Sequence, residues 1–261
     1  MRVILWLDRA ITLKNIFISL LMRDIEIIDF GLGNYREILT MQTSFFENLI
    51  SEKKSGVRGK EYLLIGEHPP VITLGRKAKE NNVLLSISLL KERGIETFHI
   101  GRGGDVTYHC PGQLILYPIL DLQSHKLGVK DYVNLLEESV ILLLREYGIT
   151  ADRIEGATGV WIDKGKADER KICAIGIKCS HFCTMHGLAL NVTSDLSGFS
   201  MINPCGFIDK GVTSLQNELC LKQASGRKPS KENSCYEGEE ISFEDVKKRL
   251  SDIFLSLIFP L

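Results

Sequence analysis

The sequence has no excess of either charge. Its 32 lysine and arginine residues stand against 33 aspartate and glutamate residues, a formal net charge of −1. A nucleic-acid-binding protein normally shows a basic excess or a dense basic face. We therefore expect no nucleic-acid partner, and leave open a local basic patch that recognises an acidic protein.

The sequence also lacks a long uninterrupted apolar run. Residues 1–22 are rich in apolar side chains, but Asp8, Arg9 and Lys14 interrupt them. This excludes a membrane helix, which needs about 20 apolar residues, and a clean signal-peptide core. No other stretch comes near that length, so we expect no membrane partner. Residues 1–21 are interpreted as an N-terminal extension of no assigned function; an organelle presequence, or a start codon upstream of the true one at Met22, are open alternatives.

The seven cysteines show no disulfide framework, because their number is odd and their spacings do not repeat. We interpret them as reduced thiols in a cytosol-like compartment. Five potential zinc ligands crowd into fourteen residues: Cys173, Cys179, His181, Cys183 and His186. A zinc site usually needs two closely spaced ligand pairs, and no second pair exists here. We expect no metal, and most of these thiols should pack as small hydrophobic side chains.

The order of apolar patterns predicts an α/β protein with mixed strands and no sharp linker. Strands are expected at 25–31, on both sides of Pro69-Pro70, at 105–109 and 113–120, and in GVWID, KICAIGIK and LALNV. Helices are expected at 35–52 and 129–148, and from a capping box at Ser242-Phe-Glu-Asp245 onward. Residues 225–240 are polar and are expected to form a solvated loop.

The densest cluster of unusual residues is GRGGDVTYHCPGQ, residues 101–113. Its glycine spacing fits neither the dinucleotide fingerprint G-x-G-x-x-G nor the phosphate loop G-x-x-x-x-G-K-[ST]. Glycines around Arg102 let a ligand lie against the main chain. A tight turn into a strand explains the composition equally well, but the neighbouring Thr107, Tyr108 and His109 favour a binding wall.

Cys205 lies between Pro204 and Gly206 in a stretch with little charge. Taken alone, such a cysteine is usually a spacer. A nucleophilic cysteine must be a thiolate, which requires a nearby cation, base or helix N-terminus. Lys210 is the only cation beside it in sequence, and Lys171, at the head of KICAIGIK, is the natural candidate from elsewhere.

Three ordered blocks make the chain resemble the lipoate-protein ligase B family, also called octanoyl-[acyl carrier protein]:protein N-octanoyltransferases. They are RGGDVTYHCPGQ at 102–113, KICAIG at 171–176, and the stretch from MHGLALNV through INPCG at 185–206. EHPPVITLGR, residues 67–76, is also similar. The resemblance spans about Asp24 to about Leu219. Some segments, notably GVWID…KICAIG and CGFIDKGVTSL, are closer to bacterial members than to organellar ones.

The resemblance implies a biotin/lipoate protein ligase fold, a mixed β-sheet with packed helices, in one catalytic domain over residues 22–261. Cys205 would take the octanoyl group from octanoyl-acyl carrier protein as a thioester and pass it to a lysine of a lipoyl domain. Lys171 would lower the pKa of Cys205 and handle the proton. The acceptors would be the lipoyl domains of 2-oxoacid dehydrogenases and the glycine cleavage H protein, with no cofactor and a bacterial-like, cytoplasmic location. The implied pocket residues are Arg102, Gly103, Gly104, Asp105, Val106, Thr107, Tyr108, His109, Ala174, Ile175, Gly176, Gly187, Leu188 and Ala189.

One position departs from the family. Cys110 stands where members mostly carry glycine after the Tyr-His pair, so it is either silent packing or a second reactive thiol near Cys205. Residues 222–240 fall outside the resemblance. Two other functions stay open: an ATP-dependent lipoate ligase, which would not need Cys205, and a non-catalytic acyl-binding protein.

Overall fold

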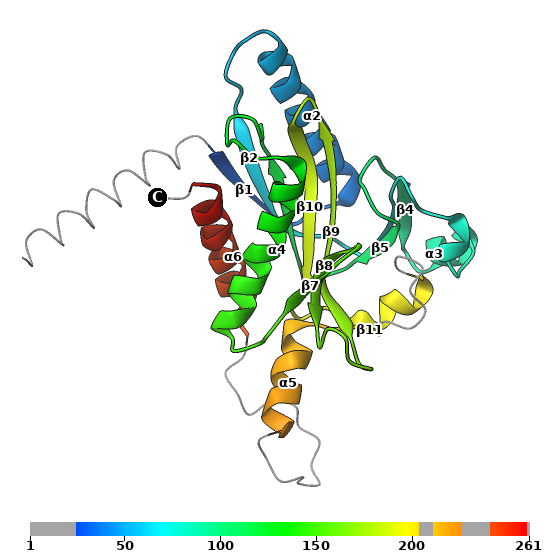
Figure 1. Ribbon diagram of the computed structural model, residues 1–261. Helices are drawn as coiled ribbons and strands as arrows, with labels where there is room; N and C mark the ends of the chain where they lie inside the picture. The colour runs from blue at the N-terminus through cyan, green and yellow to red at the C-terminus, as the bar shows by residue number, and fades with distance from the viewer. Residues whose placement is uncertain (1–24, 204–210, 226–240, 260–261) are drawn as a thin grey trace, which may run out of the picture.

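The computed structural model describes residues 25–203, 211–225 and 241–259. An eight-stranded mixed sheet forms its centre, in the order β1-β2-β6-β10-β9-β8-β7, with β11 added beside β9. A smaller sheet, β4-β3-β5, lies to one side with α3 (Figure 1). The strands are β1 Ile25–Leu32, β2 Glu61–Glu67, β3 Val71–Leu74, β4 Glu96–His99, β5 Val106–His109, β6 Gln113–Ile119, β7 Asp152–Ile154, β8 Ala157–Ile162, β9 Arg170–Ser180, β10 Cys183–Asn191 and β11 Gly211–Val212.

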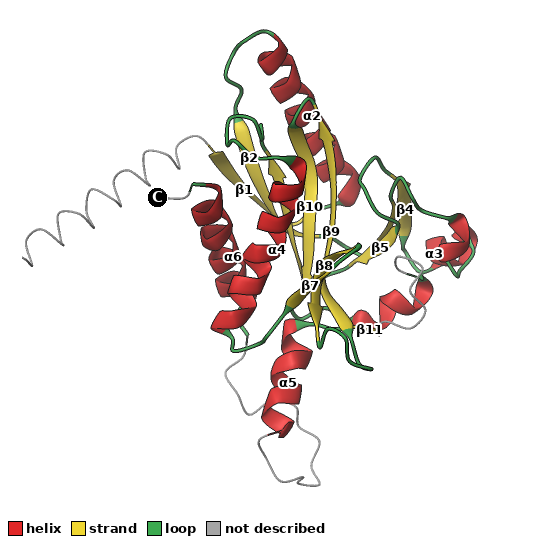
Figure 2. Cartoon of the chain, viewed as in Figure 1, coloured by secondary structure: helices red, strands yellow, loops and turns green. Residues whose placement is uncertain are grey.

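Helices cover both faces of the large sheet, as Figures 1 and 2 show. The helices are α2 Tyr35–Lys54, α3 Ile87–Glu92, α4 Val129–Glu146, α5 Leu215–Ser225 and α6 Phe243–Ile258, with short 3₁₀ turns η2 Glu80–Asn82 and η3 Leu196–Met201. On one face α4 and α6 pack against Leu114, Leu116, Leu188 and Leu190. On the other face α2 packs against Ile115, Tyr117 and Ala189. The alternation of adjacent strand residues between two buried faces produces one helix–sheet–helix sandwich.

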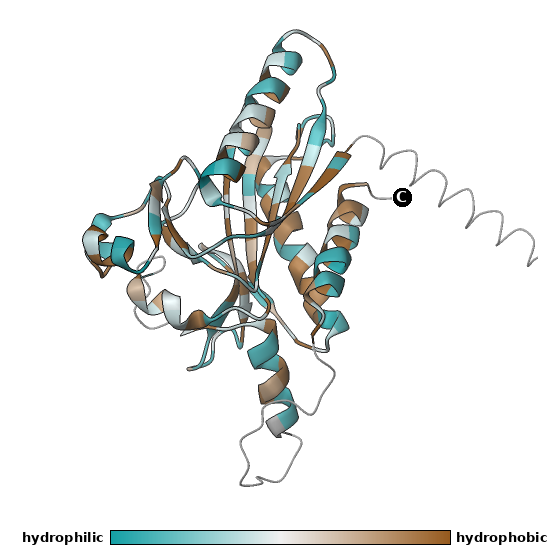
Figure 3. Ribbon diagram, turned by 180° about the vertical axis from the view of Figure 1, so that it is seen from behind, coloured by the Kyte–Doolittle hydropathy of each residue, from teal (hydrophilic) through white to brown (hydrophobic). Residues whose placement is uncertain are grey.

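The strands and helices expected from the sequence are present, with boundaries shifted by a few residues, whereas β4, β7, α3 and α5 were not predicted. Ser242 accepts a hydrogen bond from the Asp245 backbone N–H at 3.2 Å and is the N-cap of α6, which is the first half of the expected capping box. Gly148, at φ +66°, ends α4 in the left-handed region that favours glycine. Hydrophobic residues concentrate along the central strands, and polar ones occupy the outer turns of the helices (Figure 3). Residues 226–240, most of the predicted solvated loop, and the extension 1–21 lie outside the described residues.

Two features of the fold were not predictable from patterns. The strands around Pro69-Pro70 belong to different sheets, since β2 joins the large sheet and β3 the small one. Strand β11 has only two residues, too few to give a pattern. Among the described residues, no helix combines the length and the apolar character needed to cross a bilayer.

Candidate functional site

A cavity of about 420 Å³ opens between the two sheets. One wall is the glycine-rich segment that leads into β5, and the other is the face of β8, β9 and β10 that α2 leaves uncovered. Its size lies within the range of small-molecule sites. Beyond the implied pocket residues, it is lined by Tyr35, Lys77, Gln113, Tyr117, Gly156, Ala157, Thr158, Trp161, Lys171, His186, Asn191, Phe199, Gly211 and Val212.

Backbone hydrogen bonds hold the glycine-rich wall in place. The N–H groups of Arg76 and Lys77 donate to the carbonyls of Arg102 (2.9 Å) and Gly104 (3.0 Å). On the opposite side, the N–H of Gly103 donates to the Ile177 carbonyl of β9 at 2.8 Å. The segment therefore joins the two sheets across the cavity.

Arg102 stabilises that segment from inside, because its side chain is only 8% exposed. Its guanidinium donates to the Thr73 carbonyl at 2.8 Å and to the carbonyl of Gly103 at 3.0 Å. A Cβ on Gly176 would lie 2.8 Å from the Gly103 carbonyl oxygen. Glycine at 176 is thus required for the two walls to approach this closely.

Most of the pocket residues implied by the resemblance line the cavity, and two do not. Residues 102–107, His109, 174–176, Leu188 and Ala189 are lining residues. Tyr108 lies on the other face of β5, where its ring packs edge-on against Phe199 at 5.6 Å. Gly187 lies against β6, because a Cβ there would come 2.1 Å from the Leu116 carbonyl oxygen.

Lys171 reaches the cavity because of a bulge in β9. Val160 of β8 pairs with Cys173, and the next residue, Trp161, pairs with Lys171, so Ile172 is an extra residue. Ile172 and Cys173 are both fully buried against the α4–α6 core. Lys171 lines the cavity on the same face as Ala174 and Gly176, although strict alternation would place it opposite Ala174.

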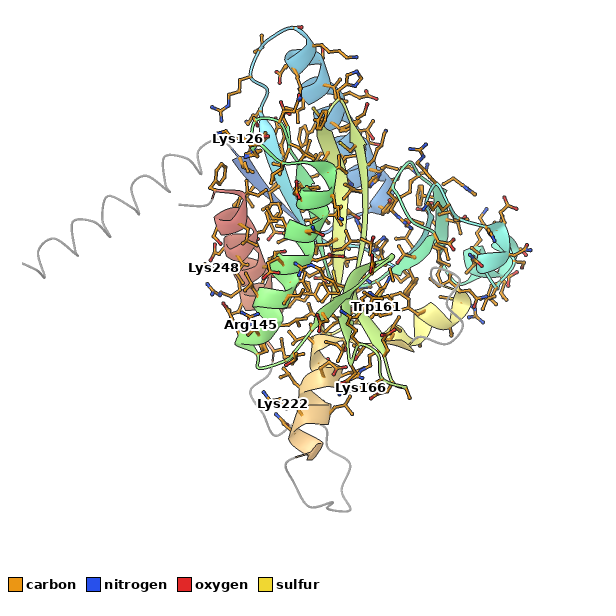
Figure 4. All side chains as sticks on the ribbon, in the orientation of Figure 1. Lys126, Arg145, Trp161, Lys166, Lys222 and Lys248 are labelled. Atoms are coloured by element: carbon orange, nitrogen blue, oxygen red, sulfur yellow. The ribbon has the colours of Figure 1, made fainter. Side chains whose placement is uncertain are left out.

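The Lys171 ammonium has two neighbours from β8. Its Nζ donates to the Thr158 carbonyl at 3.2 Å and lies 4.5 Å from the centre of the Trp161 ring, within cation–π range. Trp161, labelled in Figure 4, is only 2% exposed. Sequence reasoning identified GVWID as a strand and did not assign Trp161 to the site, because its proximity to Lys171 depends on the bulged pairing.

Strand β11 runs beside Lys171 and is clamped there. Val212 pairs with Lys171, and the Thr213 N–H donates to the Lys171 carbonyl at 2.9 Å. Thr213 donates its hydroxyl to Glu218, whose carboxylate also takes two hydrogen bonds from Arg170, at 2.7 and 2.6 Å. Through Thr213, the Arg170–Glu218 ion pair holds β11 against the N-terminal end of β9.

A second polar link ties β11 to the glycine-rich wall. The Asn191 amide donates to the Thr213 carbonyl at 2.9 Å and accepts from Gln113 at 2.9 Å. Since the Gln113 Nε2 is thereby a donor, its Oε1 accepts from His109 Nδ1 at 2.7 Å. One buried chain of hydrogen bonds therefore runs from His109 to β11.

Cys205, the candidate nucleophile, lies outside the described residues, in 204–210. Its flanks are described. Asn203 donates its N–H to the Asn82 carbonyl at 2.8 Å, and Gly211 lines the cavity. Six residue steps separate Cys205 from Gly211, a reach of at most about 20 Å.

Three buried histidines lie at or beside the cavity: His109 and His186 line it, and the ring centre of His68 lies 6.0 Å from that of His109. His68 donates from Nδ1 to the Gly33 carbonyl at 2.7 Å, so its Nε2 accepts from the Tyr117 hydroxyl at 3.2 Å. Burial lowers the pKa of His68 to about 4 and the pKa values of His109 and His186 to about 3. At neutral pH all three rings are uncharged, so Lys171, Lys77 and Arg102 are the cations that line the cavity among the described residues.

The free energy of unfolding should fall as the pH drops from about 6.5 towards 4. The unfolded chain takes up protons on these histidines near pH 6.5, whereas the folded protein resists until about pH 3–4. Stability is therefore full above pH 6.5 and decreases by up to about 1.4 kcal/mol per pH unit for each ring. Urea unfolding at pH 7.5, 6 and 5 measures the slope. In His68→Gln the dependence of the unfolding free energy on pH should be weaker by the contribution of one histidine. An unchanged dependence would contradict the lowered pKa of His68.

Cys110 packs in the small-sheet core and does not line the cavity. It is 3% exposed, its Sγ lies 3.7 Å from the Asp195 carbonyl oxygen, and burial raises its pKa to about 11. Of the two alternatives for this residue, the structure favours silent packing over a second reactive thiol.

We expect Cys110 to react with iodoacetamide at pH 7.5 about two orders of magnitude more slowly in the folded protein than in urea. A thiol with a pKa near 11 has that much less thiolate than a free thiol near 8.5. Peptide mass spectrometry after timed quenching measures the rate for each cysteine. Rapid labelling of native Cys110 would restore the reactive-thiol alternative.

The five cysteine and histidine residues considered as zinc ligands are spread along the β9–β10 hairpin. Strand pairing places Thr184 opposite Cys179 and Ser180 opposite Cys183. Cys173 is buried in the α4–α6 core, and His186 lines the cavity. Within the described ranges, no three histidine, cysteine or acidic side chains gather to hold a metal ion.

Comparison with known proteins extends these observations. Residues 34–255 match the family model described as the lipoyl protein ligase A/B catalytic domain. An octanoyltransferase from Bacteroides fragilis is 48% identical over 230 residues, covering 88% of this chain and 96% of the relative. An octanoyltransferase from Bacteroides thetaiotaomicron is 54% identical over 193 residues, covering 74% and 85%.

Solved structures agree on the fold. A lipoate-protein ligase A bound with ATP superposes with a TM-score of 0.58 at 15% identity, covering 90% of this chain and 85% of the other. A bipartite lipoate protein ligase from Thermoplasma acidophilum gives 0.55 at 17% identity, covering 90% and 83%. At such low identity these likenesses establish the fold alone, and they confirm the fold class expected from the sequence.

Proposed function

The chain belongs to the lipoyl protein ligase A/B catalytic domain family and, within it, to the octanoyltransferases, and from this premise we propose its reaction in detail. It takes an octanoyl group from octanoyl-acyl carrier protein onto Cys205 as a thioester. It then transfers the group to a specific lysine of a lipoyl domain. The proposal assigns this activity to one catalytic domain, residues 22–261, acting in the bacterial cytoplasm. Its acceptors are the lipoyl domains of 2-oxoacid dehydrogenases and the glycine cleavage H protein.

The observation that carries the proposal is the position of Lys171. The bulge turns Lys171 into the cavity, and β11, the strand that follows residues 204–210, pairs with it directly. The six residue steps from Gly211 span at most about 20 Å, which is long enough for Cys205 to contact the Lys171 ammonium. An adjacent cation stabilises a thiolate and so lowers the pKa of a cysteine.

The two acyl-transfer steps need no energy source such as ATP. The Cys205 thiolate attacks the donor's thioester carbon, the carrier leaves as a thiolate, and it takes its proton from the Lys171 ammonium, which becomes a neutral amine. The acceptor's neutral amine then attacks the new thioester, the bond to Sγ breaks, and the amine's proton passes to Lys171 or to the departing sulfur. Exchange between thioesters is nearly balanced, and amide formation from a thioester is downhill. Backbone N–H groups near Gly206 would stabilise the tetrahedral oxyanion.

The cavity walls suit a medium-length acyl chain. Val106, Ile175, Leu188, Ala189 and Phe199 supply apolar surface between the Lys171 end and the histidine end. Gly103 and Gly176 let the two walls approach the chain closely. These residues are proposed as the acyl-binding surface, with Arg102, whose guanidinium is engaged by Thr73 and Gly103, supporting the wall.

Intact-protein mass spectrometry tests the proposal and its two alternatives together. After mixing with octanoyl-acyl carrier protein without ATP, the protein should gain the mass of one octanoyl group, and hydroxylamine should remove it. Adding a lipoyl domain should move that mass to the domain. Activity only with free octanoate and ATP would favour the ATP-dependent ligase, and reversible binding with no covalent gain would favour a non-catalytic acyl-binding protein.

A further inference from the structure

A short basic segment forms part of the cavity rim. The rim loop, residues 75–79, directly follows β3 and carries Arg76, Lys77 and Lys79 within four positions. All three side chains are exposed, and Lys77 also lines the cavity. This density of one charge is notable in a chain whose net charge is −1.

The rim loop is held rigidly against the glycine-rich wall. Besides the bonds from Arg76 and Lys77 described above, the Gly75 N–H donates to the Asp105 carbonyl at 3.1 Å. The Ala78 N–H donates back to the Gly75 carbonyl at 3.0 Å, closing a turn. The three cations are therefore presented from a backbone whose position is fixed relative to the cavity.

Within the described part of the chain, none of the three cations is neutralised by an ion pair. Asp105, the acidic residue among the described cavity-lining residues, is already engaged: its carboxylate accepts from the Asn82 amide at 2.6 Å and from the Val106 N–H at 2.8 Å. Elsewhere on the surface, cations such as Arg153, Lys166 and Arg249 are paired with carboxylates. The rim loop is thus a patch of unpaired positive charge beside the opening.

We propose that the rim loop is the docking site of the donor, an acidic carrier protein whose acyl thioester is attached through an arm containing a phosphodiester. This inference rests on the proposed function. The arm must enter the cavity to deliver its thioester, so its phosphodiester passes the rim, where Lys77 and its neighbours complement the negative charge. The acceptor brings a lysine, which a cationic rim repels, so the rim loop favours the donor.

The test is the binding of the donor to the double variant Arg76→Glu, Lys79→Glu, which leaves cavity-lining Lys77 in place. Fluorescence anisotropy with labelled carrier protein bearing its phosphopantetheine arm reports binding without any chemical step. We expect the dissociation constant to rise about ten-fold or more at low salt, and the difference to shrink in 0.5 M salt. Lys248→Glu on α6, on the far side of the molecule from the small sheet (Figure 4), is the matched control and should bind as the unchanged protein does.

A kinetic comparison separates this proposal from the proposed function. With octanoyl-pantetheine, a small donor that has neither phosphate nor protein, the double variant should transfer at a rate within about two-fold of the unchanged protein. An unchanged dissociation constant for the carrier protein, or an equal loss with both donors, overturns the docking site. Absence of transfer from every donor by the unchanged protein would overturn the proposed function while the binding measurement still decides the docking site.

Discussion

Cys205→Ala is expected to abolish both the octanoyl adduct and turnover, with a loss in kcat on the order of 10³-fold or more. Without Sγ there is no atom to carry the acyl group between donor and acceptor, and the cavity can only bind. The measurement pairs intact mass after donor addition with the rate of lipoyl-domain octanoylation.

The matched control is Cys179→Ala, which removes a half-buried thiol of β9 that does not line the cavity. It should keep the adduct, the rate and the melting temperature. Cys205→Ser should lose the hydroxylamine-labile thioester as well. Transfer by Cys205→Ala at the normal rate would refute the cysteine mechanism and favour the ligase alternative, in which no thioester on the enzyme is needed.

Replacing Lys171 tests the second half of the mechanism, and we expect Lys171→Met to lower kcat by about 10²- to 10⁴-fold. Two proposed roles would be lost at once: the cation that stabilises the Cys205 thiolate and the group that takes the proton from the acceptor amine. The rate of Cys205 alkylation at pH 7 should fall as well, because less thiolate is present.

Lys171→Arg separates these roles. Arginine keeps the positive charge and cannot give up its proton, so alkylation of Cys205 should stay fast while acyl transfer to the lipoyl domain stays slow. Pre-steady-state mass spectrometry should then show acyl-enzyme accumulating. If Lys171→Arg transfers at the full rate, Lys171 acts through charge alone. If Lys171→Met is fully active, the proposed pair is wrong.

The helices and strands that could be predicted from the sequence are those with strong local patterns of apolar residues. Helix α4 and strands β6 and β10 were foreseeable because their buried residues repeat at helical or alternating spacing and glycine marks the end of α4. The partition of strands between two sheets depends on which partner each strand finds across the chain. Nothing local in EYLLIGE or VITL encodes that choice, and the two-residue β11 is set by its clamp to Arg170 through Thr213 and Glu218.

The site was foreseeable where it is continuous in sequence. Residues 102–107 and 174–176, which the family resemblance assigns to the acyl pocket, line the cavity, and their contact with an acyl group stays a prediction. Tyr108 and Gly187 were included with their blocks, yet the first points to the other face of β5 and the second meets the backbone of β6. Trp161, Asn191 and Tyr35 were absent from the expected set. They reach the cavity through strand pairing and helix packing over long sequence separations, which a single sequence does not display.

Because of the bulge at Ile172, the alternation of side chains between the two faces of the sheet shifts by one residue within β9. Beyond the bulge, Ala174 and Gly176 line the cavity, while before it the odd-numbered Lys171 does so. Enlarging the side chain at 174 would therefore narrow the cavity without turning the lysine. The width of the cavity and the orientation of the lysine therefore depend on two separate parts of one strand, so a substitution that alters the proposed acyl-length preference need not disturb the lysine.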